Sequence, residues 1–291
     1  MRTLDSTTSL RIAVQKSGRL TDKTIDLLKG IGLEFDDYKR SLLVSCRNFD
    51  VELLLIRDDD IPEYVEDGVC DLGFVGGNTV AEDEVDVTVL RGLDYGVCRL
   101  SVAVPKNGSH NIEDLAGKKI ATSYPVLTRK FFEEKGVDVQ IITLSGSVEI
   151  APRLEIADAI TDLVSSGGTL KANGLVEVGT IFHSETQLIK TNKPLSEGKQ
   201  RLIEKMLLRM EGYKKASESR YIMMNAPKEA VDTIKEIIPS LKSPTVMPLA
   251  DNGMVAIHTV VPIDTFWEVM ENLKEAGATG IVMLPIESMI V

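Results

Sequence analysis

The segment 155–174, EIADAITDLVSSGGTLKANG, has the pattern of a strand, a loop and a helix in direct succession. Its apolar run favours a buried strand, and the paired glycines after that run mark a loop before a helix-length segment. Similar short β-rich runs alternate with amphipathic, helix-length segments along the first two-thirds of the chain. That alternation is typical of sheets covered by helices, so we predict an α/β fold. The predicted strands are 10–15, 51–57, 69–75, 100–104, 119–122, 137–144 and 159–164.

The pattern changes after a long charged helix predicted at 196–217, and we place a domain boundary near Glu218. The elements that follow have the order βαββαβ, which is typical of a small ferredoxin-like domain. They are expected at 221–225, 228–238, 245–249, 254–261, 264–276 and 280–284.

Composition limits the classes of function. The 291 residues are 43% hydrophobic and carry a formal net charge of −11, which disfavours binding to nucleic acid or to an anionic membrane. No apolar run approaches the roughly 20 residues that span a bilayer, and the first residues lack an apolar signal core, so we expect a cytoplasmic protein. The three cysteines stand singly and no metal motif is present, which argues against a disulfide framework and a zinc site.

The loop of the opening segment has the chemistry of a phosphate site. Gly167 and Gly168 allow close approach of an anion to the backbone, Thr169 is expected to cap the next helix, and free N–H groups of its first turn face the ligand. We expect Asp158 and Asp162 at the carboxyl end of the preceding strand, where they accept hydrogen bonds from sugar hydroxyls. Together these features predict a phosphorylated ribose, although an ordinary strand-to-helix turn is the alternative interpretation. The predicted loop consists of Ser165, Ser166, Gly167, Gly168 and Thr169.

An acidic chain that binds polyanions needs local cations. Lys16, Arg19, Arg57 and Arg99 all lie near the ends of predicted strands, and ligands of α/β proteins bind at strand ends. Surface salt bridging is the alternative for each of them. Arg19 is the strongest candidate, because the KSGR sequence follows the first strand directly.

The chain resembles the long form of ATP phosphoribosyltransferase, the first enzyme of histidine biosynthesis, over nearly its whole length. Besides the loop segment, the matching stretches are LRIAVQKSGRL at 10–20, RDDDIP at 57–62, CRLS at 98–101, ATSYP at 121–125 and GSVE at 146–149. The resemblance implies two lobes of type II periplasmic-binding-protein-like fold and a C-terminal ferredoxin-like regulatory domain. The pattern changes at 93–101 and again after 180. The predicted first catalytic lobe is therefore 1–100 with 181–217, the second catalytic lobe, which carries the phosphoribosyl loop, is 101–180, and the regulatory domain is 218–291.

The implied reaction joins N1 of the adenine of ATP to C1 of 5-phosphoribosyl 1-pyrophosphate (PRPP), with inversion and release of pyrophosphate. Adenine nitrogen is already nucleophilic, so positioning and electrostatics suffice and no certain catalytic side chain is assigned. Mg²⁺ is expected on the substrate phosphates, with Glu149 as a candidate ligand. Asp158, Asp162 and 165–169 are assigned to PRPP. The residues assigned to ATP are Lys16, Arg19, Arg57, Asp94, Arg99 and Tyr124.

The resemblance further implies histidine as an inhibitor bound to the last domain, AMP as a competing ligand, and homo-oligomers from dimers to hexamers. The turn containing Leu249, Ala250 and Asp251 is a candidate histidine site, although a plain hairpin also explains it. Three other functions remain open: a ligand-binding module, an effector-binding regulator, and a phosphoribosyltransferase acting on a different nitrogen base.

Overall fold

The structure is a computed structural model that describes residues 9–36, 41–108, 110–238, 243–251 and 253–290. The described chain forms two compact units. One contains residues 9–26 and 34–199, and the other contains residues 27–33 and 200–290. Within the described ranges, no helix is both long and apolar enough to span a membrane.

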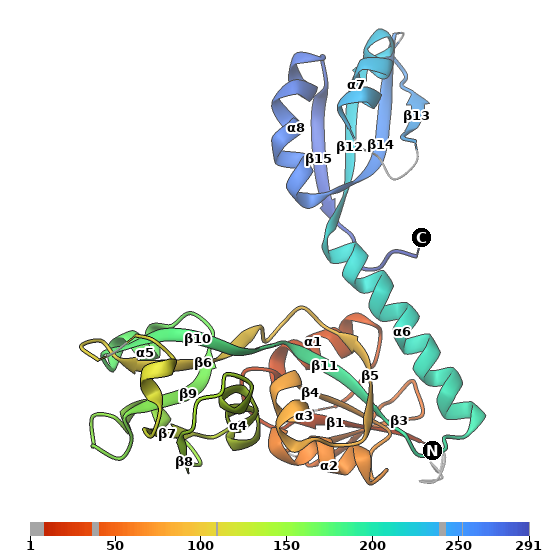
Figure 1. Cartoon of the computed structure of the whole chain (residues 1–291). Coiled ribbons are helices and arrows are strands. Elements are labelled where there is room, and N and C mark those ends of the chain that lie inside the picture. The colour runs from red at the N-terminus through yellow and green to blue at the C-terminus, as the bar shows by residue number, and fades with distance from the viewer. Residues whose placement is uncertain (1–8, 37–40, 109, 239–242, 252, 291) are drawn as a thin grey trace. The chain divides into compact units, whose positions relative to one another are not determined.

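The first lobe is built on a six-stranded sheet of order β2-β3-β1-β4-β11-β5 (Figure 1). β1 lies parallel to β3 and β4, whereas β2, β11 and β5 are antiparallel to their neighbours. β4 is buried along its whole length and β1 at all positions but Arg11 and Gln15, as expected for central strands covered on both faces. The strands are β1 Leu10–Gln15, β2 Leu43–Ser45, β3 Val51–Ile56, β4 Leu72–Gly76, β5 Val87–Gly92 and β11 Thr186–Thr191.

The helices of this lobe follow its parallel strands. α1, η2 and α3 follow the carboxyl ends of β1, β3 and β4, and α2 continues directly from η2, so the intervening loops gather at one edge of the sheet. The helices are α1 Thr21–Gly30, η2 Asp58–Asp60, α2 Ile61–Glu66 and α3 Gly77–Asp83.

The second lobe is built on a five-stranded sheet of order β10-β6-β9-β7-β8, in which β7 lies parallel to both β8 and β9. The chain enters this lobe between β5 and β6 and leaves it between β10 and β11. Two lobes joined by two crossings form the predicted periplasmic-binding-protein-like architecture. The elements are β6 Cys98–Pro105, η3 Glu113–Leu115, β7 Lys119–Thr122, α4 Pro125–Glu134, β8 Gln140–Thr143, η4 Val148–Ile150, β9 Ala159–Val164, α5 Gly168–Ala172 and β10 Leu175–Ser184.

The C-terminal sheet has the order β13-β14-β12-β15 with antiparallel neighbours, as in a ferredoxin-like domain. Ile222 and Met224 alternate with solvent-facing neighbours along β12 and pack in one core with Leu273 of α8. The predicted βαββαβ domain is confirmed. Its elements, with the helix before them, are α6 Glu197–Ser217, β12 Ser219–Pro227, η5 Lys228–Ala230, α7 Val231–Ile237, β13 Thr245–Pro248, β14 Met254–Pro262, α8 Ile263–Glu275 and β15 Thr279–Pro285.

Some predicted boundaries differ from the structure. β4 begins three residues later than predicted, because Cys70 instead closes the turn after α2 by donating its N–H to the Tyr64 carbonyl (2.9 Å). Of the residues 181–217 that the prediction groups with the first lobe, 181–199 lie in the same compact unit as that lobe, and the domain division itself stays a prediction. The functional roles predicted for the three parts stay predictions.

Candidate functional site

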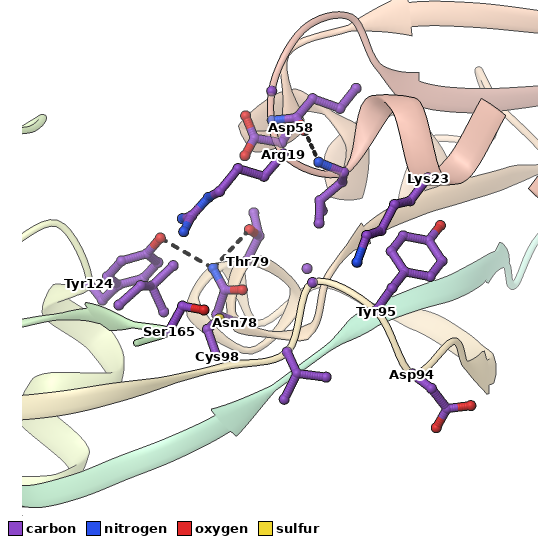
Figure 2. A pocket seen from close by; sticks show the side chains of 17 residues that line it. Arg19, Lys23, Asp58, Asn78, Thr79, Asp94, Tyr95, Cys98, Tyr124 and Ser165 are labelled. Carbon is purple, nitrogen blue, oxygen red and sulfur yellow. Dashed lines mark hydrogen bonds between the residues drawn. The ribbon is translucent and has the colours of Figure 1, made fainter. Parts of the chain in front are cut away.

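A cavity of about 730 Å³ lies between the two lobes of the first unit. Its walls come from the loop after β1, the start of α3, the crossing after β5, and the second lobe around Tyr124 (Figure 2). This size is typical of a small-molecule site. The lining residues are Gln15, Gly18, Arg19, Leu20, Lys23, Asp58, Gly76, Asn78, Thr79, Asp94, Tyr95, Gly96, Val97, Cys98, Tyr124, Leu163 and Ser165.

The loop after β1 is shaped around the side chain of Gln15. Gly18 has φ +146°, and a Cβ added there would lie 2.5 Å from the Gln15 amide nitrogen. Gln15 Oε1 also accepts a hydrogen bond from the Leu20 N–H (3.3 Å). This packing presents Arg19 to the cavity, and Figure 2 shows its side chain reaching toward Tyr124. Lys16, in the same loop, is exposed and is not part of the cavity wall.

The start of α3 carries a compact polar cluster around Asn78, which is 6% exposed. The Asn78 N–H donates to Ser184 Oγ (3.0 Å), and this hydroxyl donates to Asn78 Oδ1 (2.8 Å). The amide nitrogen of Asn78 donates to Thr79 Oγ1 (3.3 Å) and to the Tyr124 hydroxyl (3.2 Å). The last contact joins the first lobe to the second across the cavity.

Tyr124 is fixed by a buried network of threonines in the second lobe. Its N–H donates to Thr122 Oγ1 (2.9 Å), and Thr161 donates to the same oxygen (2.6 Å). Thr128 Oγ1 lies 2.6 Å from Thr161 Oγ1, and all three threonines are fully buried. Burial raises the pKa of Tyr124, as do nearby acidic groups led by Asp162, so its hydroxyl is neutral at physiological pH.

A second, smaller cavity of about 120 Å³ adjoins the loop after β9. Gly167 is the N-cap residue of α5 with φ +78°, a conformation suited to glycine. The predicted cap, Thr169, instead lies inside the first turn of α5. Arg19 borders this cavity as well as the larger one, so the two adjoin at its side chain. The wall of the smaller cavity is Arg19 with Asp162, Leu163, Val164, Ser165, Ser166, Gly167, Gly168, Thr169 and Leu170.

The two predicted ribose carboxylates are far apart. β9 begins at Ala159, so Asp158 precedes the strand and Asp162 lies within it. Because a strand rises about 3.3 Å per residue, four residues separate them by roughly 13 Å. Asp158 accepts a hydrogen bond from the Lys119 N–H (2.9 Å) on the far side from the loop. The prediction that both stand at the carboxyl end of the strand is therefore wrong for Asp158.

Asp162 is the carboxylate that borders the small cavity. Burial raises the pKa of Asp162, and a hydrogen bond from the Leu163 N–H (2.7 Å) lowers it. The negative charge of Glu149 raises this pKa further. Glu149 and Asp162 are therefore near enough to repel each other, and a bound cation would relieve that repulsion. Among the residues described, no three His, Cys, Asp or Glu side chains form a metal cluster. This pair fits an ion held chiefly by substrate phosphates.

The other predicted cations have different surroundings. Arg99 makes a bidentate contact with Glu177 through Nε (2.7 Å) and a terminal nitrogen (2.5 Å), and also donates to the Ser165 carbonyl (3.4 Å). This pair lowers the pKa of Glu177 and makes Arg99 a support for the loop. Arg57 is exposed before η2 and is not part of the cavity wall, whereas its neighbour Asp58 is.

Asp94 borders the large cavity in the crossing between lobes, with φ +56°. Its N–H donates to Glu185 Oε2 (2.7 Å). Figure 2 shows its carboxylate pointing away from Arg19 and Tyr124.

The candidate histidine residues lie in the turn between β13 and β14. The Leu249 N–H donates to the Met254 carbonyl (3.0 Å), and the Met254 N–H donates to the Asp251 carbonyl (3.3 Å). Ala250 is exposed beside them. These contacts make a hairpin turn, and the histidine assignment stays a prediction.

Sequence reasoning missed several residues of the large cavity. Asn78, Thr79 and Lys23 were not singled out, nor was Tyr95, whose hydroxyl lies 2.7 Å from Thr24 Oγ1. A signal was present in GGNT, where a buried strand runs directly into a helix through small and polar residues. It is the same strand, turn and helix pattern as in the predicted phosphate loop.

Comparison with known proteins identifies the family. The family model described as ATP phosphoribosyltransferase matches residues 57–212, and the model described as HisG, C-terminal domain matches residues 216–288. The chain belongs to the ATP phosphoribosyltransferase family. The resemblance inferred from the sequence motifs is thus confirmed, and the chain is a pentosyltransferase of the first step of histidine biosynthesis.

Relatives of known name agree with this assignment to the ATP phosphoribosyltransferase family. The ATP phosphoribosyltransferase of Bacteroides thetaiotaomicron is 47% identical over 97% of this chain and 100% of its own. A solved chain of the ATP phosphoribosyl transferase (HisG:HisZ) complex from Thermotoga maritima is 32% identical with a TM-score of 0.60. That alignment covers 69% of this chain and 98% of the other.

Proposed function

We propose that this enzyme transfers the phosphoribosyl group of PRPP to N1 of the adenine of ATP, with inversion at C1 and release of pyrophosphate. The observation that carries the proposal is the pair of adjoining cavities, about 730 and 120 Å³, which share Arg19, Leu163 and Ser165. A transfer between two phosphorylated substrates needs two neighbouring sites with a common boundary, and the two adjoining cavities support the proposal in this respect.

In this proposal the smaller cavity holds the phosphoribosyl end of PRPP. Gly167 and Gly168 leave bare backbone at the wall, and the hydroxyls of Ser165, Ser166 and Thr169 are available as hydrogen-bond donors. Asp162 accepts hydrogen bonds from the ribose hydroxyls. Asp158 is left out of this assignment, because its carboxylate is bonded to the Lys119 N–H at the other end of β9.

The larger cavity then holds ATP. Tyr124 provides a neutral aromatic wall for adenine, since a ring face stacks on a base at little electrostatic cost. Arg19 and Lys23 line the same cavity and supply positive charge for the phosphates of an otherwise acidic chain. Lys16, Arg57 and Arg99 lie outside this wall and are not assigned direct ATP contacts.

Catalysis in this scheme rests on placement and charge. Adenine N1 attacks as C1 loses pyrophosphate, and the carboxylate of Asp162 lies near the ribose, where it stabilises developing positive charge. Mg²⁺ held by the substrate phosphates, with Glu149 and Asp162, would neutralise charge on the leaving pyrophosphate. We further propose histidine and AMP as inhibitors and assembly into dimers and hexamers, carried over from the family resemblance.

The test combines the purified protein with ATP, PRPP and Mg²⁺ and follows both pyrophosphate release and the ultraviolet spectrum of the adenine ring. Product formation with ATP supports the proposal. Pyrophosphate release only with another base would indicate a different phosphoribosyltransferase, and substrate binding without turnover would indicate a binding module.

Two carboxylates of one segment provide a matched pair of variants for the sugar site. Asp162→Asn should weaken PRPP binding by about 1–3 kcal/mol, which is about 5- to 150-fold in the dissociation constant. Asp158→Asn keeps an oxygen for the Lys119 N–H and should leave PRPP affinity within about twofold of wild type. Equal effects from the two variants in calorimetry would contradict the placement of PRPP.

A further inference from the structure

The two lobes contact each other where α3 approaches the start of α4. Glu82, near the end of α3, accepts hydrogen bonds from the backbone N–H groups of Val126 (2.7 Å) and Leu127 (2.9 Å), one with each carboxylate oxygen. These N–H groups belong to the first turn of α4, where no backbone partner exists within the helix. The negative charge also lies at the favourable end of the helix dipole.

α4 has no cap of its own. Its N-cap residue is Tyr124, which makes no side-chain capping hydrogen bond, and the first helical residue is Pro125, which has no N–H to donate. The first two available amides are therefore satisfied by a residue more than forty positions earlier, in the other lobe. This differs from a local helix cap, because the hydrogen bonds form only when the two lobes are placed as they are here.

The same face of α3 also holds the side chain of Tyr124. Asn78 donates to the Tyr124 hydroxyl (3.2 Å), and Asn78 and Glu82 are four residues apart, on one face of the helix. α3 thus contacts the start of α4 at two points, through the Tyr124 hydroxyl and through the two backbone amides that follow Pro125. The ring is part of the wall of the large cavity.

We propose that Glu82 is a positioning residue: by capping α4 from the other lobe, it fixes the separation of the lobes at Tyr124 and so the width of the nucleotide cavity. The identity of the nucleotide as ATP rests on the proposed function. Glu82 itself is not part of the cavity wall, so its effect reaches the ligand through α4.

A neighbouring contact between the same helices provides a matched control. Lys130 of α4 donates to Glu84 (2.6 Å), just after α3, and the side chains are 51% and 58% exposed. Exposed pairs of this kind contribute little because solvent and salt screen them. Glu84→Gln therefore removes an inter-lobe charge pair of the same helices without removing the cap.

The experiment compares Glu82→Ala, Glu82→Gln and Glu84→Gln in the full-length protein. Calorimetry with ATP and with PRPP gives the two affinities separately, and steady-state assays give kcat and KM for each substrate. Amide hydrogen exchange of the segment containing Val126 and Leu127 reports the cap directly.

We expect Glu82→Ala to weaken ATP binding and raise the KM for ATP by about tenfold or more. PRPP affinity should stay within about threefold, because apart from Arg19 the small cavity belongs to the second lobe. Glu82→Gln keeps one accepting oxygen but loses the charge, so an intermediate effect is expected. Glu84→Gln should match wild type within twofold, and exchange at the start of α4 should accelerate only in the Glu82 variants.

Wild-type affinity and KM for ATP in a Glu82→Ala protein whose α4 amides exchange rapidly would overturn the proposal, since the cap would then be purely structural. Equal losses for ATP and PRPP in Glu82→Gln would also overturn it. If wild-type protein forms no product from ATP and PRPP, the proposed function fails. Binding of ATP and amide exchange in the same variants still decide the role of Glu82.

Discussion

Replacement of Lys199 by methionine should destabilise the first unit strongly. Lys199, in the first turn of α6, donates to both carboxylate oxygens of Asp71, at 2.9 and 2.8 Å. The side chains are only 16% and 6% exposed. Asp71 also accepts a hydrogen bond from the Arg11 N–H (2.8 Å) on β1, so the carboxylate links Lys199 to the central sheet of the first unit.

The magnitude follows from what Lys199→Met leaves behind. Removing one partner of a buried ion pair leaves the other charge buried without a partner, which typically lowers the free energy of unfolding by about 3–5 kcal/mol. Because Lys199 is slightly exposed, we expect a loss at the lower end of this range, about 3 kcal/mol. In the double variant with Asp71→Asn no buried charge is left without a partner, and the side-chain amide oxygen at position 71 can still accept a hydrogen bond from the Arg11 N–H. The double variant should therefore recover most of the loss.

Urea unfolding followed by far-ultraviolet circular dichroism measures these differences. With a slope of about 2–3 kcal/mol/M for a unit of this size, Lys199→Met should lower the midpoint by roughly 1–1.5 M. Lys215→Met is the control on the same helix, because Lys215 is 43% exposed and lies 3.7 Å from Glu211, so its loss should cost less than about 0.5 kcal/mol. A Lys199→Met midpoint indistinguishable from that of Lys215→Met would show that the pair with Asp71 contributes no more than an exposed ion pair.

Three other outcomes are expected. Gly168→Ala adds a Cβ only 3.6 Å from Ser166 Oγ, an ordinary contact, so thermal stability should be unchanged while calorimetry shows PRPP binding at least about tenfold weaker; tight PRPP binding would contradict the loop assignment. Partial desolvation and neighbouring carboxylates raise the pKa of Asp83, whose side chain is still exposed, to about 6, so its ionised form destabilises the fold slightly, and this cost grows as pH rises from 4 through 6. Asp83→Asn should therefore raise the melting temperature at pH 7.5 by a few degrees and change it little at pH 4, whereas an equal effect at both would contradict the charge argument. Deletion of 218–291 should abolish inhibition by histidine while PRPP binding persists, and full inhibition of a soluble truncated protein would disprove a regulatory role for that domain.

Elements with local signals could be predicted from the amino-acid sequence alone. β1, β7 and β9 have the predicted bounds, because each is a short β-rich run followed directly by a polar residue. The βαββαβ domain was equally predictable, since its alternating strands and amphipathic helices follow one another in order. The sequence also contained the family motifs and the phosphate loop with its glycines.

Which of the candidate side chains lie close together depends on the packing of elements that are distant in the sequence. Asp158 and Asp162 belong to one motif in the sequence, yet the extended chain separates them, with Asp158 before β9 and Asp162 within it, nearer the loop. The Glu82 cap of α4 and the ion pair of Lys199 with Asp71 join residues that are 44 to 128 positions apart. No local pattern encodes such pairs, because they depend on strand order and on the packing of the two lobes, which bring together side chains that are unremarkable in their own segments.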